Sequence, residues 1–352
     1  MSVESPYRDW QGVEQAMKAA AASSGSRTAG LGELLTRARF DRFLSRVFAD
    51  GDSSGWMLKG GTSILARVPE ARNTQDLDLA ASQASLDEAV EDLRRRVQAD
   101  LGDHLTFEFV SSKPTGLGNT QPDVHTRQVV FGCFAQSGNR RKRVGEVKVD
   151  LVVGPPPTAP ADVLEPVTRL QLAKPLPVVP YRLFPLVDHV AEKVCATMSR
   201  AYPGGRPSSR VKDLVDLVVI ARTQTVPLQP LQLAIATQQV HSRLDPFDRL
   251  QVPEGWGTRY RVMAATVPPA APVVDVEQAS ALMDDFLMPA LAPGRAPDDV
   301  AWRISRGWGP AGEPDPPRPL DAPDTGSGDV QVRPHLRDGK PITGHWRSPR
   351  GS

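Results

Sequence analysis

One stretch, from Leu58 to Leu79, constrains the fold of this chain more than any other. It contains Leu58-Lys59-Gly60-Gly61-Thr62-Ser63-Ile64-Leu65 and then Arg72-Asn73-Thr74-Gln75-Asp76-Leu77-Asp78-Leu79. This pattern predicts a short strand, a glycine turn, a helical segment and a second strand. Adjacent glycines permit a sharp turn that exposes backbone amide groups. The N-terminus of the helix that follows is a natural phosphate site, because unpaired N–H groups and the helix dipole both favour an anion.

The second strand of this stretch carries a pair of carboxylates. Side chains alternate between the two faces of a strand, so Asp76 and Asp78 should share one face while Leu77 and Leu79 point into the core. Aspartate is disfavoured in strands, although a solvated strand edge or turn is the alternative interpretation. Two carboxylates a short step from a phosphate-binding turn can hold Mg²⁺ against a triphosphate. The pattern therefore predicts nucleotidyl transfer.

This stretch resembles the signature of the nucleotidyltransferases of the AbiEii/AbiGii toxin family, in the polymerase-β-like superfamily, with MenT-like toxins of type IV-like toxin–antitoxin systems. The family pattern is K-G-G-[TS] followed by R-x-[ST]-x-D-[LI]-D-[LI], and this chain matches it without departure. A second family block joins E-K on one helix with R-x-K-D-x-x-D on the next. It appears here as Glu192-Lys193 and Arg210-Val211-Lys212-Asp213-Leu214-Val215-Asp216. The resemblance spans residues 30–290, and two linked blocks in the same order make it specific.

The resemblance implies roles for residues of both blocks. Asp76 and Asp78 would be catalytic and would bind the metal, and Lys193 would stabilise charge that develops on the triphosphate. Asp213 would complete the catalytic set. The nucleotide would be bound by the following residues: Lys59, Gly60, Gly61, Thr62, Ser63, Arg72 and Arg210.

Structural alternatives accompany these assignments. Arg72 could instead anchor the turn to the acidic strand, and Lys193 could be an ordinary surface charge. The second block could form two helix-surface ion pairs, Arg210 with Asp213 and Lys212 with Asp216.

Asp150 is the candidate for a third metal-binding carboxylate. It lies in Val147-Lys148-Val149-Asp150-Leu151, where alternation directs the apolar residues inward and Asp150 to the other face. The alternative is an exposed strand face. With Asp76 and Asp78 it would bind two Mg²⁺ ions about 4 Å apart that bridge the phosphates and activate an attacking hydroxyl. Asp150 is also a candidate to help deprotonate that hydroxyl.

Composition limits the partners and the location. Lysine plus arginine (42) nearly balance aspartate plus glutamate (41), so any RNA site must be a local patch. The run Arg140-Arg141-Lys142-Arg143 between two predicted strands could contact RNA phosphates or form a solvated hairpin turn. Two distant cysteines, Cys133 and Cys195, suit a reducing cytoplasm. The absence of a signal sequence or a long apolar run favours a cytoplasmic protein without a membrane partner.

We expect an α+β fold: a polymerase-β-like nucleotidyltransferase core, made of a small mixed sheet with flanking helices, then a helical C-terminal half and a disordered tail. The expected helices span 13–22, 31–49, 186–200, 209–221, 230–244 and 276–291, with another after Ser85; strands are expected at 56–58, 105–110, 127–135 and 145–153. The expected divisions are a flexible N-terminal segment (1–30), the core (31–180), a helical domain completing the active site (181–291) and a Pro/Gly-rich tail (292–352). A short echo in the tail, at 334–337 and 344–347, could mark a docking peptide.

Together, the residues and the resemblance predict a Mg²⁺-dependent nucleotidyltransferase toxin of a toxin–antitoxin or phage-defence (abortive infection) system. The resemblance implies that it transfers NMP from an NTP to RNA, with the 3′ end of tRNA as the expected acceptor, and so blocks translation. The resemblance also implies a cognate antitoxin protein as partner, which could act by sequestration, by covalent modification of an active-site hydroxyl such as Thr62 or Ser63, or otherwise. The alternatives are NMP transfer onto a protein side chain and a nucleotide-binding regulator without turnover.

Overall fold

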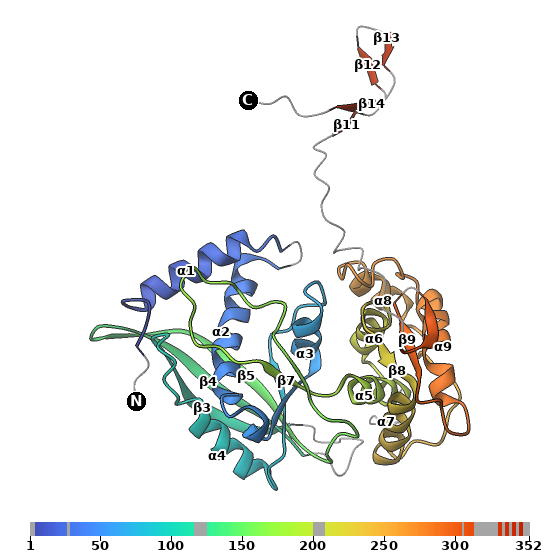
Figure 1. Cartoon of the computed structure of the whole chain (residues 1–352), viewed down its shortest axis with the longest axis horizontal. Helices are drawn as coiled ribbons and strands as arrows, with labels where there is room; N and C mark the ends of the chain where they lie inside the picture. The colour runs from blue at the N-terminus through green and yellow to red at the C-terminus, as the bar shows by residue number, and fades with distance from the viewer. Residues whose placement is uncertain are drawn as a thin grey trace. The chain divides into compact units, whose positions relative to one another are not determined.

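The computed structural model of this chain describes residues 4–26, 29–115, 125–199, 208–304 and 306–312, and four short strands between residues 330 and 347. The chain divides into two compact units, Met1–Gly312 and Glu313–Ser352. The first unit carries both sequence blocks. It combines a mixed sheet with helices (Figure 1), which confirms the predicted α+β class.

A seven-stranded sheet organises the first half of this unit, in the order β3-β4-β5-β2-β1-β7-β6. Its strands are β1 Trp56–Lys59, β2 Leu77–Ala81, β3 Leu105–Thr115, β4 His125–Ser137, β5 Arg140–Val153, β6 Asp162–Leu164 and β7 Tyr181–Leu183. The central β2 is antiparallel to β1 and parallel to β5. Leu77 and Leu79 are fully buried, as the predicted alternation requires. The strand that carries the carboxylates is thus fixed by a neighbour on each side.

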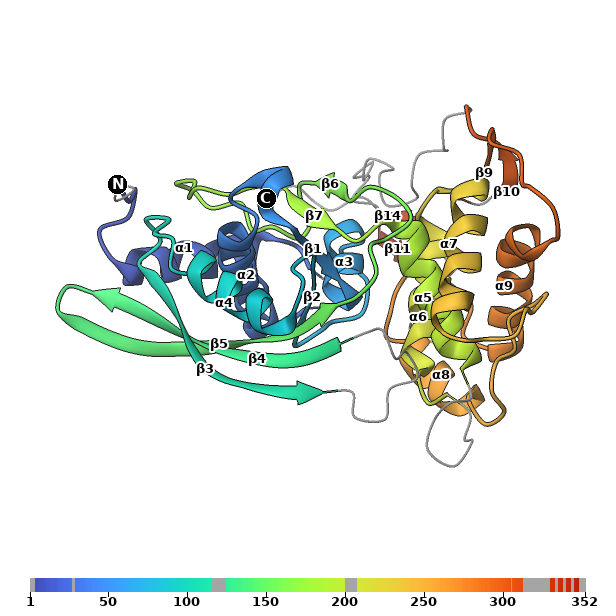
Figure 2. The same cartoon turned by 90° about the horizontal axis from the view of Figure 1, so that it is seen from below.

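Helices cover one face of this sheet (Figure 2). They are α1 Trp10–Ser23, α2 Leu31–Val47 and α4 Leu86–Arg96, while the 3₁₀ helix Gly51–Ser54 precedes β1 and α3 Gly60–Arg67 follows it. The ring of Phe43 packs against Phe107 and Phe131, at centroid distances of 5.2 and 5.3 Å. This aromatic contact joins α2 to β3 and β4 in the core.

The second half of the first unit is mainly helical, as predicted. Its elements are α5 Leu186–Met198, α6 Val211–Thr223, α7 Leu228–His241, α8 Gly257–Ala264 and α9 Val276–Leu291, with a small sheet of β8 Val226–Pro227, β9 Val300–Arg303 and β10 Gly307–Pro310. α8 was not expected from the sequence. These helices bury a second core around Leu214, Leu231 and Phe286. Within the described ranges, no helix combines the length and apolar character needed to cross a bilayer.

Two predicted boundaries differ from the structure. The N-terminal segment 1–30 is not uniformly flexible, because α1 buries Trp10, Val13 and Met17 against the first core. The tail does not begin at residue 292, because β9 pairs with β8 and Trp302 is buried. Trp302 donates a hydrogen bond from Nε1 to the carbonyl of Ala221 at 2.6 Å. Buried tryptophans, Trp10 and Trp302, therefore fix segments whose average composition is typical of a loop.

The second unit contains four short described strands, β11 Val330–Val332, β12 His335–Arg337, β13 Lys340–Ile342 and β14 His345–Arg347. β11 pairs with β14, and β12 pairs with β13, both antiparallel. The echo noted in the sequence falls on β12 and β14. The other residues of the predicted tail after Gly312 lie outside the described residues.

A buried ion cluster fastens α2 to the segment that precedes β3. The carboxylate of Asp103, which is fully buried, accepts hydrogen bonds from Arg42 Nε at 2.7 Å and from Arg46 Nη2 at 2.8 Å. Burial alone would raise the pKa of Asp103, but the hydrogen bonds and charges of Arg46 and Arg42 outweigh it and lower the pKa. The folded state therefore favours the ionised carboxylate.

We expect Asp103→Asn to lower the free energy of unfolding by about 3–5 kcal/mol at neutral pH, because two buried guanidinium groups lose their counter-charge. A carboxylate with a lowered folded pKa contributes stability above its unfolded pKa, and this contribution is lost as the pH falls through the folded pKa. The difference in free energy of unfolding between variant and wild type should therefore decrease below about pH 4. Urea unfolding at several pH values measures it. The control is Asp52→Asn, at an exposed aspartate. An equally small effect of both substitutions would contradict the stabilising role of Asp103.

Candidate active site

The glycine turn is shaped by the side chains that pass it. Gly60 has a φ of +61°, and a Cβ built on it would lie 1.8 Å from Oδ2 of Asp78. A Cβ on Gly61 would lie 3.2 Å from Nη2 of Arg72. Any larger residue at Gly60 would thus combine backbone strain with a collision. The double glycine brings the start of α3 directly against the carboxylate of Asp78 and the guanidinium of Arg72.

The predicted carboxylates meet across neighbouring strands. Asp78 is the register partner of Asp150 on β5 and of Lys59 on β1. Asp76 immediately precedes β2. Burial, followed by the charge of Asp150, raises the pKa of both Asp76 and Asp78. The Asp150 carboxylate therefore lies close enough to those of Asp76 and Asp78 to repel both.

The donor chemistry of this cluster suits a divalent cation. Carboxylate oxygens are the ligands that Mg²⁺ prefers, and two partly buried carboxylates with raised pKa values lack sufficient positive charge. Asp150 Oδ1 also accepts a hydrogen bond from Gln128 Nε2 at 3.1 Å, which orients its carboxylate. No set of three or more His, Cys, Asp or Glu side chains is positioned to hold a metal in the part of the chain that the structure describes. Metal binding therefore stays a prediction that rests on charge and ligand type.

Lys193 is buried in α5 and is not an ordinary surface charge. Its Nζ lies 3.1 Å from Oδ1 of Asp213 and 2.7 Å from Oδ2 of Asp216, both on α6. Burial would lower the pKa of Lys193, but Asp216 and Asp213 outweigh it and raise the pKa. The ammonium group is therefore held charged. The residues of the second block therefore hold the Lys193 ammonium group in place and do not form only surface ion pairs.

Arg72 connects the first block to the second. Its Nε and Nη2 donate to Oδ1 and Oδ2 of Asp216 at 2.8 and 2.9 Å, a bidentate ion pair. Burial would raise the pKa of Asp216, but Lys193 and Arg72 lower it. The alternative pairing of Lys212 with Asp216 is therefore wrong, because Asp216 turns inward while Lys212 stays exposed. The other alternative pair is present, since Arg210 Nε lies 2.6 Å from Oδ2 of Asp213.

A second ion pair joins the same two blocks. Lys59 Nζ binds Oε1 of Glu192 and lies 4.0 Å from the centroid of the Phe184 ring. Lys59 thus fixes β1 to α5 in this structure, which is a structural role beside the nucleotide contact predicted for it. Glu192 is the acidic member of the E-K pair, so both blocks contribute to each connection.

The two hydroxyl residues of the turn differ in position. Thr62 is half-buried, and its Oγ1 donates to the backbone carbonyl of Asp76 at 3.2 Å. Ser63 is fully buried, and its Oγ has no hydrogen-bond partner among the described residues. Phosphate contact is therefore more accessible to Thr62 than to Ser63. Successive side chains on a helix point about 100° apart around its axis, so Thr62 and Ser63 face different surroundings. The sequence pattern alone did not distinguish them.

Lys212 is a cation near the carboxylates to which the sequence interpretation gave no role there. Its charge lowers the pKa of both Asp76 and Asp78, although burial and Asp150 prevail. It is exposed at the start of α6. The signal was present, because Lys212 is the lysine of the R-x-K-D-x-x-D block.

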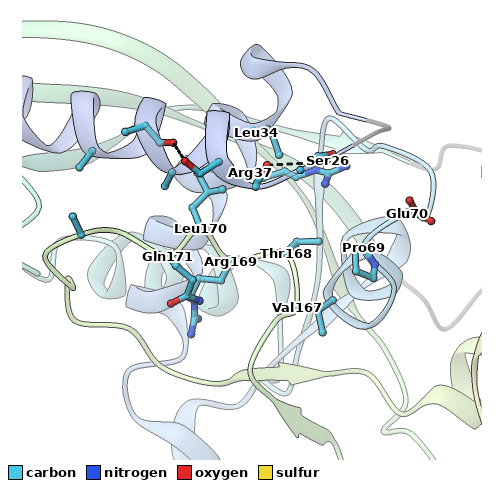
Figure 3. A pocket seen from close by; sticks show the side chains of 17 residues that line it. Ser26, Leu34, Arg37, Pro69, Glu70, Val167, Thr168, Arg169, Leu170 and Gln171 are labelled. Carbon is cyan, nitrogen blue, oxygen red and sulfur yellow. Dashed lines mark hydrogen bonds between the residues drawn. The ribbon is translucent and has the colours of Figure 1, made fainter. Parts of the chain in front are cut away.

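A cavity of about 600 Å³ lies away from these residues, between α1, α2 and the segment around residues 167–173 (Figure 3). Its lining is mainly apolar and includes Ala16, Leu34, Pro69, Val167 and Leu170. None of the residues predicted for the site lines it. The cavity is therefore separate from the carboxylate cluster.

Comparison with known proteins agrees with the resemblance seen in the sequence. A family model described as the nucleotidyl transferase AbiEii toxin of a type IV toxin–antitoxin system matches residues 42–284. The search of curated proteins returned no match.

Three solved structures are similar over most of their lengths. MenT4, a nucleotidyltransferase toxin of Mycobacterium tuberculosis H37Rv, is 19% identical, with 79% of this chain and 90% of that chain covered and a TM-score of 0.47. A putative nucleotidyltransferase of Helicobacter pylori is 15% identical, with coverages of 75% and 95% and a TM-score of 0.40. JHP933 of Helicobacter pylori is 14% identical, with coverages of 74% and 91% and a TM-score of 0.39.

We expect Asp78→Asn to raise the melting temperature of the metal-free protein at neutral pH. Because burial and Asp150 raise the folded pKa of Asp78, its contribution to stability is complete below the unfolded pKa and is lost as the pH rises through the folded pKa. Above about pH 4 the wild type should therefore lose stability relative to the variant. Added Mg²⁺ should reverse the order, by stabilising only the protein that binds it.

Differential scanning calorimetry with EDTA and with millimolar Mg²⁺ measures both effects. Asp298→Asn, at an exposed acid in the pair with Arg295, is the control. A variant that melts below the wild type in EDTA, or an equal response of both proteins to Mg²⁺, would contradict a strained carboxylate cluster.

Proposed function

This chain belongs to the nucleotidyl transferase AbiEii toxin family of type IV toxin–antitoxin systems, and we propose that it transfers NMP from an NTP to RNA in a Mg²⁺-dependent reaction. The proposed acceptor is the 3′ end of tRNA, whose modification would block aminoacylation and hence translation. The observation that carries the proposal is the convergence of both sequence blocks on one cluster of carboxylates and cations. Family membership implies an NTP substrate and an antitoxin partner.

The carboxylates Asp76, Asp78 and Asp150 would hold Mg²⁺. The bound ions would neutralise the triphosphate and lower the pKa of the attacking hydroxyl. Asp150, oriented by Gln128, is placed on the strand face that carries Asp78, where it could accept the proton of that hydroxyl. Gly60 leaves space for the backbone of the turn to approach the phosphates.

The cations would stabilise the departing pyrophosphate. A lysine ammonium has three donors, and the Lys193 contacts with Asp213 and Asp216 use two of them. One donor would therefore point to a phosphate oxygen while the two carboxylates keep the group in place. Arg210 and Lys212, both on the exposed side of the second block, would contact the same phosphates. Asp213 would act by positioning Lys193 and Arg210.

The position of the hydroxyls bears on how the antitoxin would act. Covalent modification of the turn would require an accessible hydroxyl, and Thr62 is half-buried whereas Ser63 is fully buried. We therefore propose Thr62 as the acceptor if the antitoxin silences the enzyme by modification. Sequestration is the alternative.

The test uses the purified protein, Mg²⁺, total tRNA and each α-³²P-labelled NTP in turn. We expect label on tRNA with one NTP or one class of NTP. Asp76→Asn should remove the signal, and Lys193→Gln should lower kcat by about 10²-fold, the usual effect of losing one group that stabilises transition-state charge. Asp298→Asn should behave as the wild type.

Two results would change the proposal. Label on protein instead of RNA would indicate NMP transfer onto a side chain. A protein that binds nucleotide but never consumes it, with any acceptor present, would be a regulator and would contradict the enzymatic proposal.

A further inference from the structure

The hairpin formed by β4 and β5 extends to one side of the sheet (Figure 2). The basic run Arg140–Arg143 lies at its end. Ser137 and Arg140 form its last pair, so the turn lies at Gly138 and Asn139. The run Arg140–Arg143 begins β5 instead of forming the turn, and all four side chains are exposed. We call residues 137–143 together with Phe134 the hairpin end.

Part of the hairpin end, Arg141, Arg143 and Phe134, shares a sheet face with the carboxylate cluster, whereas Arg140 and Lys142 alternate to the other face. Val147 and Val149 are fully buried, so Lys148 and Asp150 lie on the opposite, open face. A bulge shifts the register so that Val144 is skipped and Arg143 pairs with Phe134. Because the bulge absorbs one residue, Arg143 returns to the open face.

Arg39 of α2 fixes this bulge. Its Nη1 donates to the carbonyl of Val144 at 3.3 Å, and a Cβ on Gly145 would lie 3.1 Å from its Nε. The glycine therefore leaves space for the guanidinium. The hairpin end is held in a defined orientation relative to the core.

An arginine lies over an aromatic ring at the hairpin end. The guanidinium carbon of Arg141 lies 3.8 Å from the ring centroid of Phe134. Phe134 is on the open face, since its ring lies 2.8 Å from the position of a Cβ on Gly132. A planar cation stacked on an aromatic ring is a surface that nucleic acids contact through phosphate and base.

The acidic partners of these cations are exposed and replaceable. Arg141 pairs with Glu108, and Arg143 pairs with Glu146 at 2.9 Å. No ion pair involves Arg140 or Lys142 within the described part of the chain. Solvent-exposed ion pairs contribute little stability, so phosphate groups can replace the two glutamates as partners of the arginines at a small cost in free energy.

We propose that the hairpin end binds the sugar–phosphate backbone of the RNA acceptor, at a point remote from the reacting 3′ end. The proposal rests on the proposed function. Along β5, the separation from Asp150 to Arg141 corresponds to about 30 Å at roughly 3.3 Å per residue. An acceptor must therefore extend by about that distance from its reacting 3′ end to contact both places, which a tRNA does and an oligonucleotide of only a few nucleotides does not.

The experiment compares two acceptors with the same 3′ sequence, a full-length tRNA and a short single-stranded oligonucleotide. The test variant replaces Arg140, Arg141, Lys142 and Arg143 by Gln. The matched control replaces four exposed arginines of the helical half, Arg249, Arg259, Arg261 and Arg295, by Gln. We expect the hairpin variant to raise KM for tRNA about tenfold or more with kcat unchanged, and to leave both constants for the oligonucleotide unaltered.

Binding is measured independently of turnover, by anisotropy of fluorescent tRNA at several salt concentrations. For every phosphate that the variant no longer binds, the slope of log affinity against log salt should fall by about 1. Unchanged tRNA affinity in the hairpin variant would overturn the proposal, as would an equally large decrease in the control variant. A loss of antitoxin binding with tRNA binding intact would also overturn it and would assign the surface to protein. If the wild type binds tRNA through the hairpin end but transfers no label, the proposed function fails while this inference stands.

Discussion

The bidentate ion pair between Arg72 and Asp216 is the contact on which the arrangement of the site depends. It joins the loop before the acidic strand to the second helix of the helical half, and Asp216 shares its charge with Lys193. A buried ion pair of this kind contributes little net stability, because desolvation offsets the attraction. Substitution of only one of the two residues is strongly destabilising, since it leaves a buried charge without a partner. The pair therefore fixes the geometry between two parts of the chain that are distant in sequence.

Charge is distributed unequally on the two sides of this connection. In the helical half the negative charge of Asp216 is balanced, since Lys193 and Arg72 lower its pKa. In the sheet half the negative charge of Asp78 is not balanced, since burial and Asp150 raise its pKa. Folded proteins retain such uncompensated groups mainly where they function. Gly60 lets the turn lie directly beside the Asp78 carboxylate, because a Cβ at that position would collide with it.

The sequence predicted the strands and helices that carry the site, because alternation and glycine turns are local signals. It placed Leu77 and Leu79 in the core and the carboxylates opposite them, and the structure agrees. It could not choose between the surface pair Lys212–Asp216 and the buried contact of Asp216 with Arg72, because that choice depends on packing between distant segments. The order around Trp302 was missed for a similar reason, since one buried aromatic outweighs a composition averaged over many residues.

The central claim is that the two blocks form a single site for a nucleotide with Mg²⁺. Titration calorimetry with non-hydrolysable analogues of the four NTPs, with Mg²⁺ and with EDTA, tests it most directly. We predict Mg²⁺-dependent binding of at least one analogue, weakened about tenfold or more by Asp76→Asn on the sheet side and by Lys193→Gln on the helical side, a change of at least roughly 1.4 kcal/mol in binding free energy. Affinity that is indifferent to Mg²⁺ and unchanged in both variants would contradict the account.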